Sequence, residues 1–173
     1  MLTIALILPP PSGRTRMMNW SLRLLIVLGL SLAAPVAHAQ ALTQNTQLAF
    51  GALQKPSSGS KTFTVTRTGA TSGTGTKLYG TTSAGSYRIT RGSLPTGTVT
   101  IDIQNASTGS AAVTLGTFTG KWGNTNIASF PRSGLTRPTV AGTILLIGAT
   151  LTYTSAVSTG SLSPTFDIVL TQP

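Results

Sequence analysis

The stretch that decides the fold is "TILLIGATLTYT", residues Thr143–Thr154, which is the longest candidate strand in the chain. Its first part, Ile144–Ile147, is continuously apolar, whereas Leu151 and Tyr153 alternate with threonine. A strand that is buried on both faces has a continuous apolar run. A β-bulge at Gly148 that turns Leu151 and Tyr153 back inward produces the same pattern. We expect a central strand with a bend at Gly148, because an exposed edge with this sequence would aggregate.

The last strand is expected at Thr165–Thr171, where Phe166, Ile168 and Leu170 occupy every second position. Successive side chains of a strand point to opposite faces, so these three share one face. The strand either closes its own domain or helps to hold a neighbouring subunit. The other segments with a period of two are Gln47–Phe50, Lys61–Arg67, Gly75–Tyr79, Tyr87–Thr90, Thr98–Gln104, Ala112–Thr119 and Ile127–Phe130.

Residues 40–173 are expected to form an all-β domain, a single immunoglobulin-like antiparallel β-sandwich. No segment after residue 39 has the apolar spacing of a helix. Clusters of Gly, Pro and Ser separate the segments and supply the backbone dihedrals of turns. Short strands rich in Thr, Val and Ile at this spacing are typical of a sandwich. The alternation predicts inward-facing side chains at Phe63, Val65, Val99, Ile101 and Ile103.

Residues 1–39 have the organisation of a cleaved signal peptide. An 11-residue apolar run, Leu24–Ala34, precedes Ala37-His-Ala39, the small-x-small pattern after which signal peptidase cuts. A spanning helix needs about 20 apolar residues, so the run predicts cleavage before Gln40 rather than a membrane anchor. The basic residues ahead of the run are Arg14, Arg16 and Arg23.

The start of the chain is longer than a signal requires. Met17 or Met18 begins a signal of ordinary length, so we expect residues 1–16 to lie upstream of the true start. No twin arginine precedes the apolar run, which favours the Sec route of export. The expected location is therefore the periplasm, the outer cell surface or the extracellular space, with no membrane span in the mature chain.

The 134 residues after position 39 contain nine lysines and arginines, two aspartates and no cysteine, glutamate or histidine. This length suits one domain with one core, held without disulfides. The net charge of +7 favours anionic partners. Because the basic residues form no run and no nucleic-acid-binding motif is present, we expect no nucleic-acid partner.

The absence of cysteine, glutamate and histidine after position 39 excludes most classes of enzyme. Ser-His-Asp and Cys-His catalysis and metal sites built from His or Cys lack their essential groups. Asp102 and Asp167 remain as a carboxylate pair of the kind that hydrolyses glycosides. Each takes an outward position in an alternating strand, which predicts two solvated aspartates instead. We therefore expect no catalytic residue, no metal and no cofactor.

The candidate ligand-binding residues are Trp122 and Lys121, in the Gly- and Asn-rich stretch Gly120–Asn126. An exposed indole at this place can stack on a sugar ring or anchor a protein contact. The competing interpretation is a tryptophan that caps the end of the core, since Trp is usually well buried.

Five segments together resemble a family of exported bacterial proteins catalogued as domain of unknown function number 4402. The resemblance implies an immunoglobulin-like sandwich with surface or pilin-like association, and it carries over no catalytic residue. The segments that carry it are Leu48-Ala-Phe-Gly51, Tyr87-Arg-Ile-Thr-Arg-Gly-Ser-Leu-Pro95, Val99-Thr-Ile101, Ile147-Gly-Ala-Thr-Leu151 and Thr165-Phe-Asp-Ile-Val169.

Two functions from different classes follow. The first is a non-enzymatic exported structural or adhesive protein, such as a fimbria- or pilin-like surface subunit that self-associates by β-strand addition. In that case Ala41–Leu53 is the segment to be exchanged, although self-completion by Thr165–Thr171 is an equal alternative. The second is a surface or periplasmic module that binds anionic polysaccharide through Trp122 and nearby basic residues.

Overall fold

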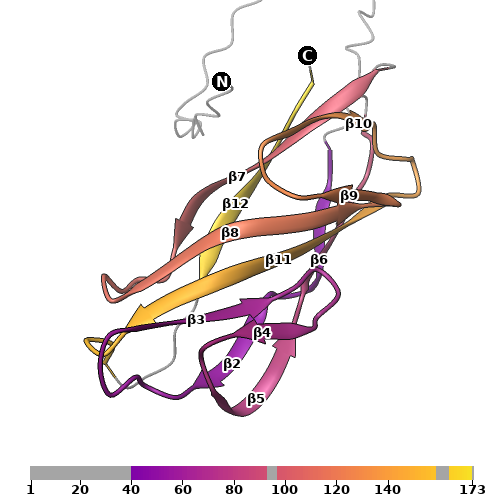
Figure 1. The fold of residues 1–173 in the computed structure, drawn as a ribbon. Helices are drawn as coiled ribbons and strands as arrows, with labels where there is room; N and C mark the ends of the chain where they lie inside the picture. The colour runs from indigo at the N-terminus through magenta and orange to yellow at the C-terminus, as the bar shows by residue number, and fades with distance from the viewer. Residues whose placement is uncertain (1–39, 93–96, 159–163, 173) are drawn as a thin grey trace, which may run out of the picture. The chain divides into compact units, whose positions relative to one another are not determined.

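The computed structural model describes residues 40–92, 97–158 and 164–172, which form twelve β-strands and no helix (Figure 1). All strand pairs are antiparallel, so the prediction of an all-β antiparallel fold is confirmed for these residues. The described ranges thus offer no helix of the length and apolarity that a membrane crossing requires. The signal-peptide prediction falls on residues 1–39, outside the described residues.

The strands form three sheets. The largest has the order β1-β6-β11-β3-β4, with β8 on the second edge of β11 and β9 beyond β8; the second has the order β10-β7-β12; and the third pairs β2 with β5. The strands are β1 (Leu42–Thr46), β2 (Ala49–Leu53), β3 (Ser60–Val65), β4 (Thr71–Gly73), β5 (Lys77–Ser83), β6 (Gly85–Ile89), β7 (Thr98–Ser107), β8 (Val113–Trp122), β9 (Thr125–Ile127), β10 (Arg132–Thr136), β11 (Thr143–Thr154) and β12 (Thr165–Thr171).

Strand β11 is the centre of the largest sheet and has the predicted bounds. One of its edges pairs first with β6, up to Ile147, and then with β3, from Ala149 onward. Its other edge pairs with β8 along almost the whole length. Gly148 lies where the first edge changes partner, and the backbone of Thr66 and Arg67 there occupies the space that a side chain would need.

β11 is the central strand that the sequence predicts, and the bulge beside Gly148 lies on β8 rather than on β11, which excludes the alternative of a bulge at Gly148. While β11 advances two residues, from Gly148 to Thr150, β8 advances three, from Thr119 to Gly116. The extra residue is accommodated at Thr117, which has a φ of 46°. On β11 itself the alternation is unbroken, with buried side chains at Leu145, Ile147, Ala149, Leu151 and Tyr153.

The bulge changes which face of β8 points inward. Val113 is buried before it and Trp122 after it, although these residues are an odd number of positions apart. A strand without an extra residue would send them to opposite faces. The parity change at Thr117 therefore lets both ends of β8 contribute to the core.

The core consists of two clusters that share β11. The first lies between the largest sheet and the β10-β7-β12 sheet, and the second lies beside β2 and β3. The first cluster is Tyr87, Ile89, Val99, Ile101, Trp122, Ile127, Leu135, Leu145 and Ile147. The second cluster is Leu48, Phe50, Phe63, Val65, Val113, Ala149, Leu151 and Tyr153. This arrangement is β-sandwich-like, and Phe63, Val65, Val99 and Ile101 are buried as predicted.

Two half-buried aromatic rings join the clusters. Phe118 of β8 and Phe166 of β12 each pack against both, and their ring centroids are 5.3 Å apart at an angle of 61°. Phe166 also meets the ring of Tyr87 edge-on, at 6.0 Å. Edge-to-face contacts of this kind favour the pair by about 1 kcal/mol beyond burial.

Both terminal strands pair within the chain. Strand β12 pairs with β7, and Ile168 and Leu170 pack on the first cluster. Strand β1, which the sequence did not predict, pairs with β6. The C-terminal strand therefore completes a sheet of its own domain in this structure.

Gly148→Ala tests the switch of partners on β11. The new methyl group meets the β3 backbone, so we expect a loss of about 3 kcal/mol in the free energy of unfolding. Gly116→Ala is the control, because a Cβ at Gly116 meets nothing within 4 Å, and it should change stability by less than about 1 kcal/mol. Urea unfolding of both variants measures the difference, and equal midpoints would contradict the assignment.

Candidate functional site

Trp122 is a core residue, as the core-capping interpretation predicts, so the alternative of an exposed ligand-binding indole is wrong. Its side chain is 1% exposed, and its indole N–H donates a hydrogen bond to the Thr136 carbonyl oxygen at 2.7 Å. The stretch Gly120–Asn126 is the end of β8, a turn and most of β9 rather than a loop. Lys121 lies on the other face of β8, opposite Leu146 of β11. The two residues therefore form no common binding surface.

The two aspartates lie on neighbouring strands of the second sheet. Asp102 of β7 faces Val169, and Asp167 of β12 faces Gln104. The amide of Gln104 donates to Asp102 at 2.9 Å and the amide of Asn105 donates to Asp167 at 2.6 Å. Both carboxylates thus accept hydrogen bonds from side-chain amides, and within the described ranges no three His, Cys, Asp or Glu residues gather as metal ligands.

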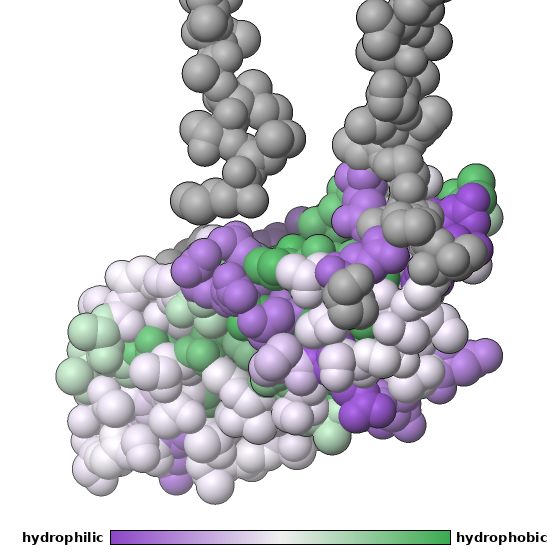
Figure 2. Space-filling view, turned by 90° about the horizontal axis from the view of Figure 1, so that it is seen from above, coloured by the Kyte–Doolittle hydropathy of each residue, from purple (hydrophilic) through white to green (hydrophobic). Residues whose placement is uncertain are grey.

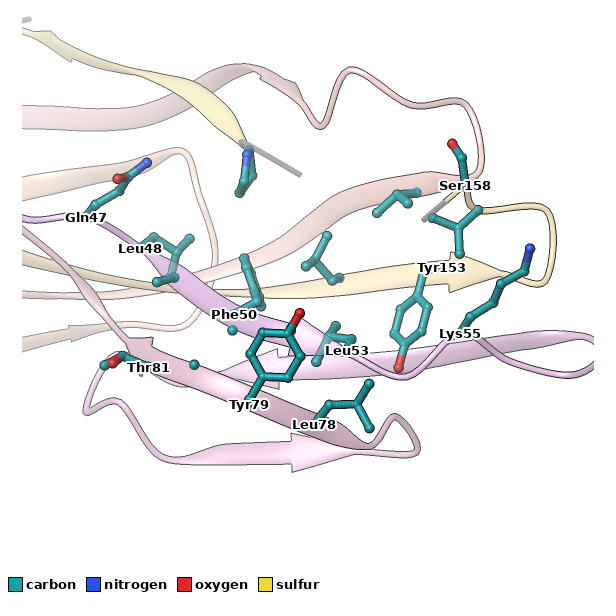
Figure 3. A pocket seen from close by; sticks show the side chains of 18 residues that line it. Gln47, Leu48, Phe50, Leu53, Lys55, Leu78, Tyr79, Thr81, Tyr153 and Ser158 are labelled. Atoms are coloured by element: carbon teal, nitrogen blue, oxygen red, sulfur yellow. The ribbon is translucent and has the colours of Figure 1, made fainter. Parts of the chain in front are cut away.

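The structure instead shows a groove beside the two-stranded sheet, which we call the β2–β5 groove (Figure 3). It has a volume of about 850 Å³. Its lining combines the second core cluster with exposed side chains of β5 (Figure 3). The lining residues used below are Gln47, Leu48, Phe50, Leu53, Lys55, Leu78, Tyr79, Thr81, Tyr153 and Ser158.

One wall of the groove comes from β2. Leu48, just before the strand, and Phe50 are 2% and 5% exposed, so they belong to the core and line the groove at once. At Gly51 the backbone has a φ of 69°, and a Cβ there would be 2.9 Å from the Tyr79 carbonyl oxygen. Glycine at this position lets β2 and β5 approach each other closely.

The other wall comes from β5, none of whose residues is buried. Leu78 is 58% exposed and Tyr79 is 73% exposed, and both line the groove. Figure 3 shows Tyr79 and Phe50 at the middle of the groove, with Gln47 and Thr81 toward one end and Lys55, Tyr153 and Ser158 toward the other. Strand β5 is held by its pairing with β2 and by the hydrogen bond of 2.7 Å that the Ser83 hydroxyl donates to the Gln47 carbonyl oxygen.

Tyr153 supplies the one buried polar atom in the lining that has no hydrogen-bond partner among the described residues. Its side chain is 3% exposed, and its hydroxyl abuts Gly75. Burial raises the pKa of this phenol above the ordinary value of 10.0 by desolvation. At neutral pH the hydroxyl is therefore protonated and uncharged.

The β2–β5 groove has few titratable side chains in its described lining. Lys55 is the single charged residue among the described residues that line it, and no carboxylate lines it. General acid–base catalysis needs a group that titrates near neutral pH, and a raised phenol does not supply one. An apolar cleft of this volume with a few polar groups at its ends resembles sites for small organic ligands.

No protein family, curated protein or solved structure shows significant similarity to this chain. The resemblance to the domain family number 4402 therefore stays a prediction. The groove residues were not predicted from the sequence. One signal in the sequence could have indicated part of the lining. Leu78 and Tyr79 are adjacent large apolar side chains, and the alternation of a strand cannot place both on one inward face.

Trp122→Phe tests the core role of the indole. The change removes the hydrogen bond to Thr136 and leaves space in the first cluster, so we expect a loss of about 2 kcal/mol in unfolding free energy. Lys121→Gln, the neighbour on the other face, should change it by less than about 0.5 kcal/mol. Thermal and urea unfolding report both values. A fully stable Trp122→Phe variant would show that the indole is dispensable to the core.

Alkaline pH should destabilise the fold through two phenols. Burial raises the pKa of Tyr87 and of Tyr153 above 10.0, so in the unfolded chain each loses its proton at lower pH. The contribution of these two phenols to stability is therefore fully present below pH 10 and is lost as the pH rises through their folded-state pKa values. The double variant Tyr87→Phe, Tyr153→Phe should lose most of this dependence, as read from urea midpoints between pH 8 and 11.

The control for the alkaline series is Tyr79→Phe, which replaces an exposed tyrosine and should retain the full decline in stability. The same slope in the double variant and in the unmodified protein would argue against the two buried phenols as the cause.

Proposed function

We propose that this protein is a non-enzymatic exported structural or adhesive subunit with an immunoglobulin-like sandwich, comparable to a fimbrial or pilin subunit. Support comes from the antiparallel sheets around a shared apolar core and from the signal-like residues 1–39. The surface also fits a scaffold role. Figure 2 shows near-neutral residues over much of one face, with hydrophobic residues visible between them. Threonine, serine and glycine have this intermediate hydropathy.

The observation that carries the proposal is the seam between the two terminal strands, which we define as the space flanked by β1 and β12. Each of these strands pairs with one neighbour only among the described residues. The groove between them has a volume of about 450 Å³, and its lining includes Leu42, Gln44, Phe166 and Ile168. Two unpaired backbone edges beside apolar side chains are suited to receive a strand from another subunit.

Strand addition at the seam differs from an exchange of Ala41–Leu53. That segment already pairs within the chain, through β1 with β6 and β2 with β5. An incoming strand therefore adds to a complete domain and replaces none of its own strands. The alternative function, a module for anionic polysaccharide, is weaker because it requires an exposed indole and Trp122 is buried.

Leu42→Lys tests assembly at the seam. Leu42 is 52% exposed on β1, and a lysine on an edge strand disfavours the addition of a further strand. We expect the unmodified protein to form oligomers or fibres in negative-stain images and light scattering, and the variant to lose most of them.

Val140→Lys is the matched control for assembly, because Val140 is 72% exposed and does not line the seam. This variant should assemble as the unmodified protein does. A protein that stays monomeric at high concentration and in sheared cell-surface material would contradict the proposed function.

A further inference from the structure

Large hydrophobic side chains at the β2–β5 groove are exposed to water, and the packing of the fold does not account for this exposure. Leu78 and Tyr79 are two of the four large hydrophobic residues that are exposed in the described part of the chain, and they are adjacent at the rim of this groove. Single exposed apolar residues are common on proteins, but grouped ones beside a cleft mark an interaction site. The groove therefore has the features of a surface that is covered by a ligand.

The lining determines the body of that ligand. In the middle of the groove, Leu48, Phe50 and Leu53 on one side and Leu78 and Tyr79 on the other offer one phenol as their only side-chain hydrogen-bonding group. The polar side chains of the lining lie toward its two ends (Figure 3). A sugar placed between the two walls would lose water from its hydroxyls without gaining partners, which is unfavourable for each such group. An aliphatic chain loses nothing polar, and each methylene that it buries favours binding.

The charge near one end of the groove determines the head of the ligand. Lys55 is exposed and lies toward the same end as Ser158 (Figure 3). The two acidic residues after position 39, Asp102 and Asp167, lie on β7 and β12 and do not line the groove. A cation beside an apolar cleft without carboxylates attracts an anionic head group.

A second copy of the chain is a poor occupant of this groove. Residues 40–173 have a net charge of +7, so a partner copy brings positive potential toward Lys55 and Lys77. Like-charged surfaces disfavour association, and this acts at the groove, whose lining holds Lys55 and no carboxylate, but not at the seam, whose lining holds Asp167 and no lysine or arginine. The seam between β1 and β12 is the candidate surface for self-association, and neither Lys55 nor Tyr79 lines it.

We propose that the β2–β5 groove binds a linear aliphatic carboxylate, with the chain between the walls of β2 and β5 and the carboxylate at Lys55. Tyr79 covers the chain with its ring from the β5 side. This site goes beyond the structural or adhesive role and does not depend on assembly, because Lys55 and Tyr79 do not line the seam.

The test measures displacement of the fluorescent fatty acid cis-parinaric acid by palmitate, using the full chain. Tyr79→Ser removes the apolar cover and should weaken palmitate binding about tenfold or more. Val140→Ser is the matched control, because the two side chains are 73% and 72% exposed and Val140 does not line the groove. Because both positions are exposed, folding of either variant can be verified by its unchanged urea midpoint.

The head group is tested with Lys55→Gln. We expect palmitate to bind about three- to tenfold more weakly, and less so at high salt, because the ion pair at the rim is partly screened. Palmitate methyl ester, which has the chain without the charge, should bind this variant and the unmodified protein equally. Lys61→Gln, at an exposed lysine of β3 that does not line the groove, should leave palmitate binding unchanged.

Three results would overturn the proposal: no saturable palmitate binding, equal losses for Tyr79→Ser and Val140→Ser, or equal losses for palmitate and its methyl ester in Lys55→Gln. Each is independent of the assembly test, since a protein that fails to form fibres can still bind palmitate. The reverse also holds, because fibres without palmitate binding would leave the seam intact and remove the ligand site.

Discussion

The whole structure depends on how β11 shares its two edges. One edge serves β6 and then β3, and the change happens at Gly148, where no side chain fits. The other edge is followed by β8, which absorbs an extra residue at Thr117 opposite the same point. Because side chains alternate with a period of two, that single residue decides whether Phe118 and Trp122 face the core or the solvent. A strained φ at Thr117 is thus the condition for one sheet to serve two clusters.

The same division explains why a groove exists. The first cluster is covered by the opposing β10-β7-β12 sheet, whereas the second is bordered by β2 and β5, a sheet of only two strands. Two strands present too little surface to close a cluster of this size, and a two-stranded sheet has little stability of its own. Leu48 and Phe50 therefore belong to the core on one side and to the β2–β5 groove on the other.

The sequence was most informative where burial dictates a pattern. Strands β11 and β12 have the predicted bounds, and Phe63 and Val65 point inward as alternation requires. Strands β1, β4 and β10 were missed because they are almost entirely exposed, so no apolar period marks them. The glycine of β11 allowed a bulge there as one explanation of the apolar run, whereas the extra residue lies in β8. For Trp122 the sequence left burial and exposure open, because Gly- and Asn-rich surroundings fit a loop as well as the tight β8–β9 turn that the structure shows. The groove arises from pairing between residues 49–53 and 77–83, and no local pattern reports such a contact.

The β2–β5 groove and the seam are neighbours, and this has a thermodynamic consequence. Gln47, Leu48 and Pro164 line both. Leu48 is 2% exposed, so a shift of its side chain toward one space withdraws it from the other. A ligand in the groove and a strand in the seam, as proposed, would then each alter the affinity for the other by the same factor, because coupling free energies are reciprocal.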